Sequence, residues 1–361
     1  MAPQAAVVSY RLGGSDGVSV EARKWAWALG ELGFEVRRVA GAFGDEQPDD
    51  LVVPGLTIAP EGTVDGEALR EGISAADLVI VENVLSLPLN LAAAREVAAA
   101  VEAVPGRVLF RHHDLPWQRR HLAHLENVFP PRLDGVLHAC VNLRSRRELQ
   151  ARGFDAAYTI HNYFDFDAWN GDRAATRAAF GFGDEELVVF HPARAIERKN
   201  VPGGVRFAAR LASITRRSVR YWLSGPAEDG YASTLTRVLE RADVPVTVGP
   251  PPTAPDGYAA GDVIAFPSTW EGFGNPAIES IAARRPCAVF RYPVLAEILA
   301  AGVRLFSIEF PENLVKFLAD TEVAQQQYYD VNLHRARLSF DIAALPVAIE
   351  RTFAAHGWTA W

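Results

Sequence analysis

Short apolar segments alternate with amphipathic stretches along most of this chain. Segments rich in valine, isoleucine and phenylalanine are typical of strands buried in a parallel sheet, and stretches with a 3.6-residue period are typical of helices. The predicted strands are residues 5–10, 34–39, 78–82, 108–111, 135–141, 159–163, 187–191, 221–224, 246–248, 263–266 and 288–291. The predicted helices are residues 19–32, 144–152, 203–213, 232–241 and 345–356. This alternation predicts an α/β fold of Rossmann-like units.

The pattern is interrupted at residues 165–171, which read Asp-Phe-Asp-Ala-Trp-Asn-Gly. With 361 residues the chain is long enough for two domains of ordinary size. We therefore interpret this segment as a linker, and predict an N-terminal domain over residues 1–164 and a C-terminal domain over 165–339. The Asp-Phe-Asp triplet is either turn chemistry or a metal-binding D-x-D pair, and its place in a linker favours the turn.

Residues 263–279 predict a strand, a loop with two glycines, and a helix. Asn275-Pro276 has the pattern of an N-cap followed by the first helical residue. The glycines allow the backbone to approach a ligand closely, and the start of a helix favours an anion such as phosphate. Glu271 and Glu279 frame the loop, and a carboxylate can accept hydrogen bonds from a sugar diol. The alternative is an ordinary βα turn with two surface glutamates.

A second loop carries two cations, Arg194 and Lys199, just past the predicted strand 187–191. Lysine is rare here, since the chain has only two others. A guanidinium can bind two phosphate oxygens at once and an ammonium acts as a point charge, so the pair suits a diphosphate. Such cations stabilise the charge that builds on a departing nucleoside diphosphate. The alternative is solvated surface cations, which is our interpretation of Arg198.

In the first half, Gly13 and Gly14 follow the predicted strand 5–10. They form either a close-approach loop for a donor phosphate or an acceptor, or a plain tight turn. The spacing lacks the G-x-G-x-x-G pattern, so no dinucleotide cofactor is indicated.

Two adjacent histidines, His112 and His113, lie just past the predicted strand 108–111, where ligands bind in open α/β sheets. They either hydrogen-bond a substrate, pack in the interior, or join His121 and His124 in a metal site. Because no fixed third ligand accompanies the His-x-x-His spacing, we favour a substrate role and expect no metal.

Composition narrows the class of protein. The residues are 49% hydrophobic and 22% charged, as in globular proteins, and the net charge of −8 argues against a general nucleic-acid binder. No apolar run approaches the roughly 18 residues that span a bilayer, and no signal peptide is evident, so we expect a cytoplasmic protein. Cys140 and Cys287 fall in different predicted domains and are expected to be reduced. The arginine-rich residues 144–152 form either a solvated helix face or a contact with an anionic acceptor or membrane.

The second half resembles the retaining glycosyltransferases of family 4, which have the GT-B fold of two Rossmann-like domains facing each other across a cleft. Glu271 and Glu279 match the E-x7-E signature, and Arg194 and Lys199 match the Arg-x4-Lys pattern. The resemblance implies that Lys199 and Arg194 stabilise the departing diphosphate, Glu271 orients the sugar, and Glu279 holds the ribose. It also implies that a histidine, for which we choose His113, approaches the donor sugar. The other residues that it places at the donor are Gly13, Gly14, Gly225, Phe273, Gly274 and Asn275.

The resemblance also implies an activity and a partial domain plan. We expect retaining transfer of a hexose from a UDP- or GDP-linked donor to a hydroxyl of a small-molecule, glycan or lipid-linked acceptor, without metal or cofactor. The loop at residues 249–257 would hold the base, and the helix at about 340–361 would cross back to the first domain. The alternatives are a GT-B phosphorylase, a sugar-nucleotide epimerase, or a non-catalytic nucleotide-sugar-binding protein. The sugar, the acceptor and the oligomeric state stay open.

Overall fold

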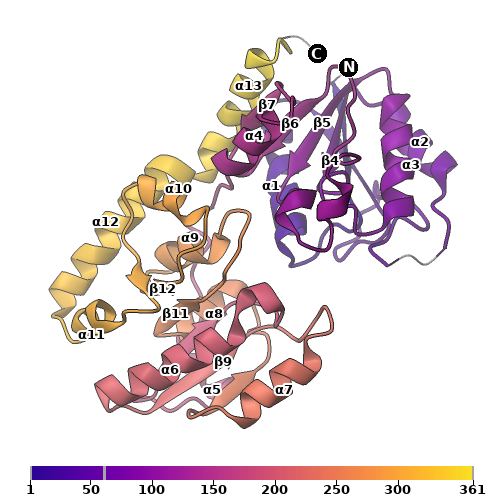
Figure 1. Ribbon diagram of the computed structural model, residues 1–361. Coiled ribbons are helices and arrows are strands. Elements are labelled where there is room, and N and C mark those ends of the chain that lie inside the picture. The colour runs from indigo at the N-terminus through magenta and orange to yellow at the C-terminus, as the bar shows by residue number, and fades with distance from the viewer. Residues whose placement is uncertain (1, 60–61, 360–361) are drawn as a thin grey trace. The chain divides into compact units, whose positions relative to one another are not determined.

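The computed structural model describes residues 2–59 and 62–359, which form two compact units (Figure 1). The first unit contains the chain up to Tyr163 together with the segment from Ile342 onward, and the second is Phe164–Asp341. Each unit has its own parallel sheet and its own buried apolar clusters.

The first unit is a seven-stranded parallel sheet in the order β3-β2-β1-β4-β5-β6-β7. Helices α2 and α3 cover one face of the sheet, and α1 and α13 cover the other. The central strand β4 is buried along its whole length, which explains its continuous apolar sequence. The strands are β1 (Gln4–Val8), β2 (Glu35–Ala40), β3 (Leu51–Val52), β4 (Leu78–Glu82), β5 (Arg107–His112), β6 (Leu137–Cys140) and β7 (Ala157–Thr159). The helices are α1 (Gly17–Glu31), α2 (Gly66–Ser74), α3 (Leu91–Glu102), α4 (Leu143–Gln150) and α13 (Leu345–Ala355), with single 3-10 turns at Pro116–Gln118, Ala123–Leu125 and Ile342–Ala344.

The second unit is a six-stranded parallel sheet in the order β10-β9-β8-β11-β12-β13. Helices α6, α7 and α11 contribute to the apolar cluster on one face, whereas Tyr258 of α8 packs against Phe190 of β8 with ring centroids 5.6 Å apart. The strands are β8 (Leu187–His191), β9 (Val219–Leu223), β10 (Val246–Val248), β11 (Val263–Phe266), β12 (Cys287–Val289) and β13 (Phe306–Ser307). The helices are α5 (Arg173–Phe180), α6 (Val201–Thr215), α7 (Ala232–Glu240), α8 (Ala254–Ala260), α9 (Asn275–Ala282), α10 (Leu295–Ala300), α11 (Glu312–Leu318) and α12 (Glu322–Phe340), with a 3-10 turn at Glu197–Lys199.

Each sheet has a point where the strand order reverses. In the second unit β8 leads outward to β9 while β11 leads outward to β12, so the reversal lies between β8 and β11. In the first unit it lies between β1 and β4. In open α/β sheets ligands bind outside the carboxyl ends of the strands at such a switch point. The loops after β8 and β11 are therefore the topologically expected ligand site of the second unit.

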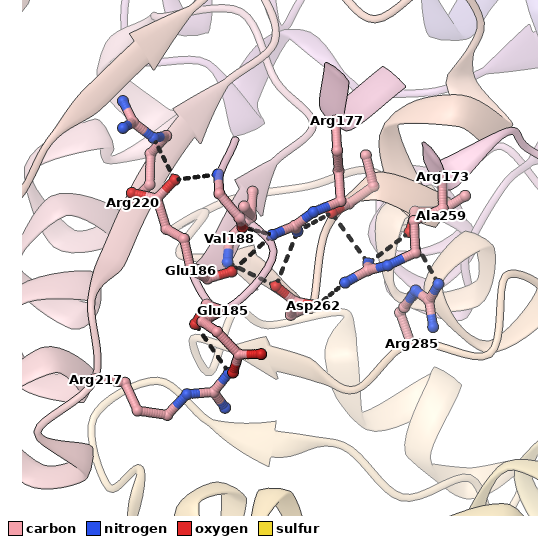
Figure 2. A network of polar contacts seen from close by, with 12 residues as sticks. Arg173, Arg177, Glu185, Glu186, Val188, Arg217, Arg220, Ala259, Asp262 and Arg285 are labelled. Atoms are coloured by element: carbon pink, nitrogen blue, oxygen red, sulfur yellow. Dashed lines mark hydrogen bonds and ion pairs between the residues drawn. The ribbon is translucent and has the colours of Figure 1, made fainter. Parts of the chain in front are cut away.

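The opposite ends of β8 and β11 are held by an ionic network around Asp262 (Figure 2). Asp262 accepts hydrogen bonds from the backbone N–H of Val188 at 2.8 Å, from Arg173 at 2.5 Å and from Arg177 at 3.3 Å. Arg177 is buried and also donates to the carbonyl of Glu186 at 2.8 Å. The network fixes the starts of the two strands whose far ends carry the candidate site.

Replacing Asp262 with alanine is expected to lower the free energy of unfolding by about 3 kcal/mol, because it leaves the buried Arg177 without its carboxylate. Denaturant unfolding measures this change. The matched control is Glu312→Ala, which removes an ion pair whose Arg210 and Glu312 side chains are 47% and 53% exposed. That exposed pair should contribute less than about 1 kcal/mol. Equal effects of the two substitutions would show that the network in Figure 2 is not a stability determinant.

Two sequence predictions about elements need correction. The predicted strand 159–163 lies earlier, at Ala157–Thr159, and the loop predicted for 249–257 becomes helix α8 from Ala254 onward. Thr253 caps α8 by accepting a hydrogen bond from the N–H of Asp256 at 3.3 Å, and a proline occupies its first turn. This is a regular helix-start pattern that the preceding run of prolines obscured.

The Asp165–Asp167 segment forms a turn within the second unit. The side chain of Asp165 accepts a hydrogen bond from the N–H of Asp167 at 2.9 Å, which is an Asx turn. Asp167 itself pairs with Arg337 of α12.

Candidate active site

The loops after β8 and β11 are joined by a buried ion cluster. Lys199 Nζ lies 2.6 Å from Glu271 Oε1, and Arg198 Nη1 lies 2.8 Å from Glu271 Oε2. The Lys199 and Glu271 side chains are only 12% and 9% exposed. The carboxylate of Glu271 thus binds two cations beyond the carboxyl ends of β8 and β11, where the strand order reverses.

Backbone hydrogen bonds hold the same two loops in register. The N–H of Thr269 donates to the carbonyl of Arg198 at 2.9 Å, and the side chain of Asn200 donates to the carbonyl of Pro267 at 3.2 Å. Asn200 adopts a left-handed conformation with φ of 51° and caps α6 by accepting from the N–H of Gly203 at 3.1 Å. The structure therefore brings together the cation loop and the glutamate loop that the sequence singled out.

The ionisation states in the cluster follow from burial and mutual attraction. Burial alone would raise the pKa of Glu271, but the charges of Lys199 and Arg198 outweigh it and hold this pKa at about 2. Burial lowers the pKa of Lys199, and its attraction to Glu271 opposes that shift while the charge of Arg198 adds to it. Glu271 is therefore an anion across the physiological range, and an ionised carboxylate can only accept hydrogen bonds.

The stability of the protein should therefore fall in acid as this cluster is lost. A carboxyl group with a depressed folded-state pKa stabilises the native state above its unfolded pKa, and this contribution disappears as the pH falls through the folded value. For Glu271 the window runs from 4.5 down to about 2. We expect the free energy of unfolding to decline over this range, and to decline less steeply in Glu271→Gln. Parallel pH profiles of the two proteins would contradict the assignment.

The two arginines of the cation loop have different surroundings. Arg198, interpreted from sequence as solvated, binds both Glu271 and the carbonyl of Trp270, the latter at 3.1 Å, so that interpretation was wrong. Arg194 pairs with Glu228 of the loop after β9 at 2.5 Å, and both side chains are 39% exposed. An exposed pair of this kind is worth little, so Arg194 can exchange Glu228 for a phosphate at small cost.

Glycines permit the tight packing of the loops around the site. A Cβ on Gly225 would lie 2.7 Å from the Cα of Arg194, so the loop after β9 approaches the cation loop only because this residue is glycine. Gly274 has a φ of 117°, and a Cβ there would lie 1.9 Å from the hydroxyl of Tyr292. That hydroxyl donates to the carbonyl of Phe273 at 3.0 Å, which fixes the turn before α9.

The start of α9 differs by one residue from the sequence prediction. Gly274 is the N-cap, Asn275 is the first helical residue, and no side chain caps the helix. The reason is the left-handed conformation of Gly274, which turns the chain one residue earlier than an asparagine cap would. The ring of Phe273 is buried between Phe164 and Phe340, with centroid distances of 6.3 and 5.6 Å, so only its backbone can serve a ligand.

Glu279 lies one turn into α9 and is half-buried. Its Oε2 accepts a hydrogen bond from the hydroxyl of Tyr258 at 2.5 Å. Tyr258 is buried on α8, and burial together with the nearby charge of Glu279 raises the pKa of its hydroxyl well above the usual value. Tyr258 is thus a neutral donor that orients one oxygen of Glu279.

In the first unit, Gly13 and Gly14 occupy the loop between β1 and α1. Gly13 has a φ of 72°, and a Cβ there would lie 1.6 Å from Oδ1 of Asp45, so this loop packs closely on the loop after β2. A Cβ on Gly14 would lie 3.2 Å from Asp16, the N-cap of α1. Both glycines therefore have a packing role, and their contact with a donor stays a prediction.

The two adjacent histidines at the end of β5 have different surroundings. His112 is fully buried, with Nδ1 lying 2.6 Å from the hydroxyl of Ser86 and Nε2 lying 2.9 Å from Nδ1 of His138. Burial lowers the pKa of His138 to about 3 and that of His112 well below its usual value, so this pair is neutral and internal. His113 is 13% exposed and contacts Glu82. Of the two, only His113 is placed to meet a ligand.

Sequence reasoning missed several residues that shape the site. Arg198, Tyr258 and Tyr292 contact predicted site residues, yet each lies far along the chain from its partner or was hidden by a stronger neighbour. Only Arg198 had a usable signal, since it stands directly before Lys199.

The described part of the chain contains neither a metal-binding cluster nor a membrane-spanning helix. They contain no group of three or more histidine, cysteine, aspartate or glutamate side chains arranged to hold a metal ion. None of the helices in residues 2–59 and 62–359 has both the length and the apolar character needed to cross a membrane.

The chain is similar in sequence and in fold to several sugar-transferring enzymes. Residues 172–327 match the family model for glycosyl transferases group 1. The mannosylglucosylglycerate synthase of Thermotoga maritima is 26% identical, in an alignment that covers 96% of this chain and 94% of that protein. The protein of the same name from Petrotoga mobilis is 24% identical, over 81% of this chain and 84% of that protein.

Solved structures extend the likeness to both units. The structure of Anabaena HepE in complex with UDP and glucose matches with a TM-score of 0.73 at 17% identity, covering 98% of this chain and all (100%) of that chain. Sucrose-phosphate synthase from Thermosynechococcus elongatus matches with a TM-score of 0.72 at 15% identity, covering 99% of this chain and 100% of that chain.

Proposed function

We propose that this chain, which is a group 1 glycosyltransferase with the GT-B fold, transfers a hexose with retention of configuration from a UDP- or GDP-linked donor to a hydroxyl group of an acceptor. The observation that carries the proposal is the joining of two cations and one permanently ionised glutamate at the switch point of the second unit. Cations at this edge suit a diphosphate and the glutamate suits sugar hydroxyls.

Lys199 and Arg194 stabilise the leaving diphosphate in this proposal, with the backbone of Phe273, Gly274 and Asn275 at the start of α9. Negative charge grows on the diphosphate as the glycosidic bond breaks, so fixed positive charge lowers the barrier. Arg198 adds a third cation that holds Glu271 in place. No metal ion is needed in this scheme, since the protein supplies the compensating charge itself.

Glu271 acts through hydrogen bonds in this proposal and forms no covalent bond. Both of its oxygens are already engaged by Lys199 and Arg198, which compensate its charge and reduce its nucleophilicity. Its remaining lone pairs accept hydrogen bonds from the sugar and fix its orientation. Retention then requires that the acceptor attacks from the face that the diphosphate leaves, with a diphosphate oxygen taking the proton.

The names of the two full-length relatives favour a small-molecule acceptor over a glycan or a lipid-linked one. The two relatives named above, each aligned over most of its length, are synthases of mannosylglucosylglycerate, a small glycoside. We therefore propose a small acceptor with free hydroxyl groups, such as a glycoside of glycerate, and mannose among the donor sugars to test first.

Product analysis tests the proposal. Purified protein is incubated with UDP-glucose or GDP-mannose and a panel of small glycosides, and the anomeric configuration of the product is read by NMR. The proposal predicts an α-linked glycoside from these α-linked donors, formed equally well after treatment with EDTA. An inverted product, a free sugar phosphate, or an epimerised donor would contradict it.

A further inference from the structure

We infer that Glu82 is a positioning residue that fixes the imidazole of His113 with its Nε2 hydrogen turned toward the protein and its Nδ1 presented as a hydrogen-bond acceptor to a substrate hydroxyl. This inference rests on the proposed function, because it assumes that His113 meets the substrate. It goes beyond the proposed function by assigning a role to Glu82, a tautomer to His113, and a direction to the hydrogen bond between His113 and the substrate.

Two adjacent residues at the end of β4 contact His113, one at its ring and one at its backbone. Oε2 of Glu82 lies 2.9 Å from Nε2 of His113, and the side-chain oxygen of Asn83 accepts a hydrogen bond from the N–H of His113 at 3.1 Å. Asn83 has a φ of 63°, and its own N–H donates to the carbonyl of Arg111 at 3.0 Å. A left-handed non-glycine residue is uncommon and persists only where its surroundings hold it. Both the backbone and the ring of His113 are therefore held by adjacent residues of one strand end.

The charge state of Glu82 decides the direction of the hydrogen bond to His113. Glu82 is completely buried, and burial alone would raise its pKa, but Arg111 and His113 outweigh this and lower the pKa. Glu82 is therefore ionised and can only accept hydrogen bonds. The hydrogen between the two side chains must then reside on Nε2 of His113, and in the neutral ring this leaves a lone pair on Nδ1.

A buried chain of alternating charges helps to keep Glu82 ionised. Arg111 lies 2.9 Å from Glu82 and 3.3 Å from Glu21, and Lys24 lies 2.6 Å from Glu21. Two cations thus balance two carboxylates. Arg111 is 1% exposed and its guanidinium lies 4.7 Å from the centre of the Trp25 ring, which fixes its place. With Nε2 turned toward Glu82, a substrate hydroxyl can donate a hydrogen bond to the lone pair on Nδ1 of the neutral ring.

Glu82→Gln should reverse the tautomer of His113. Arg111 has only donors, so the amide oxygen of the new side chain would turn toward Arg111 and its NH2 group toward His113. Nε2 of His113 would then have to accept, and its hydrogen would move to Nδ1. Nδ1 of His113 would then carry a hydrogen, so it could no longer accept a hydrogen bond from the substrate hydroxyl.

The experiment compares Glu82→Gln with Glu21→Gln. Both remove a buried carboxylate from Arg111, but only Glu82 contacts His113. Long-range ¹H–¹⁵N spectra of the histidine side chains, assigned by the signals lost in His113→Ala, report the tautomer. We expect an Nε2-protonated ring in the wild type and in Glu21→Gln, and an Nδ1-protonated ring in Glu82→Gln. We expect kcat/KM for the donor to fall at least tenfold in Glu82→Gln and less than threefold in Glu21→Gln.

A hydrogen on Nδ1 of His113 in the wild type would overturn the inference, and this result needs no variant of Glu82 to fold. Equal losses of activity in Glu82→Gln and Glu21→Gln, with the tautomer unchanged in both, would also overturn it, since Glu82 would then act only through Arg111. Full activity of His113→Ala would instead remove His113 from the proposed function. The tautomer of His113 thus tests the inference, and the activity of His113→Ala tests the proposed function, independently of each other.

Discussion

Lys199→Ala is expected to lower kcat by on the order of 100-fold while the protein remains folded. Lys199 supplies fixed positive charge beside the leaving diphosphate, and removal of one such preorganised group typically costs 100- to 1,000-fold in turnover. The fold should survive because Arg198 stays bound to Glu271 at 2.8 Å, so the buried carboxylate keeps a cation. Steady-state kinetics measure the change, and thermal unfolding checks the fold.

Lys316→Ala is the matched control for this substitution. Lys316 is exposed on α11, outside the site, and its loss should leave turnover within about twofold of wild type. A folded Lys199→Ala protein with turnover close to that of the Lys316 variant would show that Lys199 serves only to anchor Glu271.

The second large effect is expected for Glu279, whose replacement by alanine should raise the donor KM by about 10- to 100-fold. A hydrogen bond to a charged group is worth about 1.5–3 kcal/mol, and the net loss of one such bond to the ribose diol corresponds to roughly 10- to 100-fold in affinity. Turnover should change much less, because the ribose is bound equally in the ground state and in the transition state. Donor titrations at saturating acceptor measure both quantities.

Tyr258→Phe separates positioning from direct binding at Glu279. The tyrosine hydroxyl lies 2.5 Å from one oxygen of Glu279, so its loss should raise the donor KM in the same direction but by less than the loss of Glu279 itself. A Glu279→Ala protein that loses acceptor affinity and keeps its donor KM would contradict the placement of the ribose.

The sequence predicted the strands that are buried on both faces. β4, β8 and β11 lie where the apolar runs indicated, because a continuous apolar segment between breakers has few alternatives to a buried strand. Helix α12 was not predicted, since it is only sparsely buried and lacks an apolar stripe to mark it. The predicted α/β architecture, GT-B fold and enzyme class were confirmed, whereas membership of family 4 in particular stays a prediction.

The site was predictable where function constrains local sequence, and was not where contacts come from distant segments. Lys199 and Glu271 stood out because a rare lysine and a framed glutamate follow apolar strands, and the structure joins them. Tyr258, which contacts Glu279, and Glu228, which contacts Arg194, could not be predicted from sequence spacing. Each lies in a different segment of the chain from its partner. The interpretation of Arg198 was wrong because the sequence of its own loop does not show that Glu271, from a distant loop, lies next to it in the fold.

The central claim is that a donor diphosphate binds between the cation loop at residues 194–199 and the start of α9. A crystal structure of the protein soaked with UDP-glucose or GDP-mannose tests it most directly. The account predicts phosphate oxygens within hydrogen-bond distance of Nζ of Lys199 and of the backbone N–H groups at residues 273–275, with the ribose at Glu279. A diphosphate bound elsewhere, with Lys199 still bound to Glu271 and to no phosphate oxygen, would contradict it.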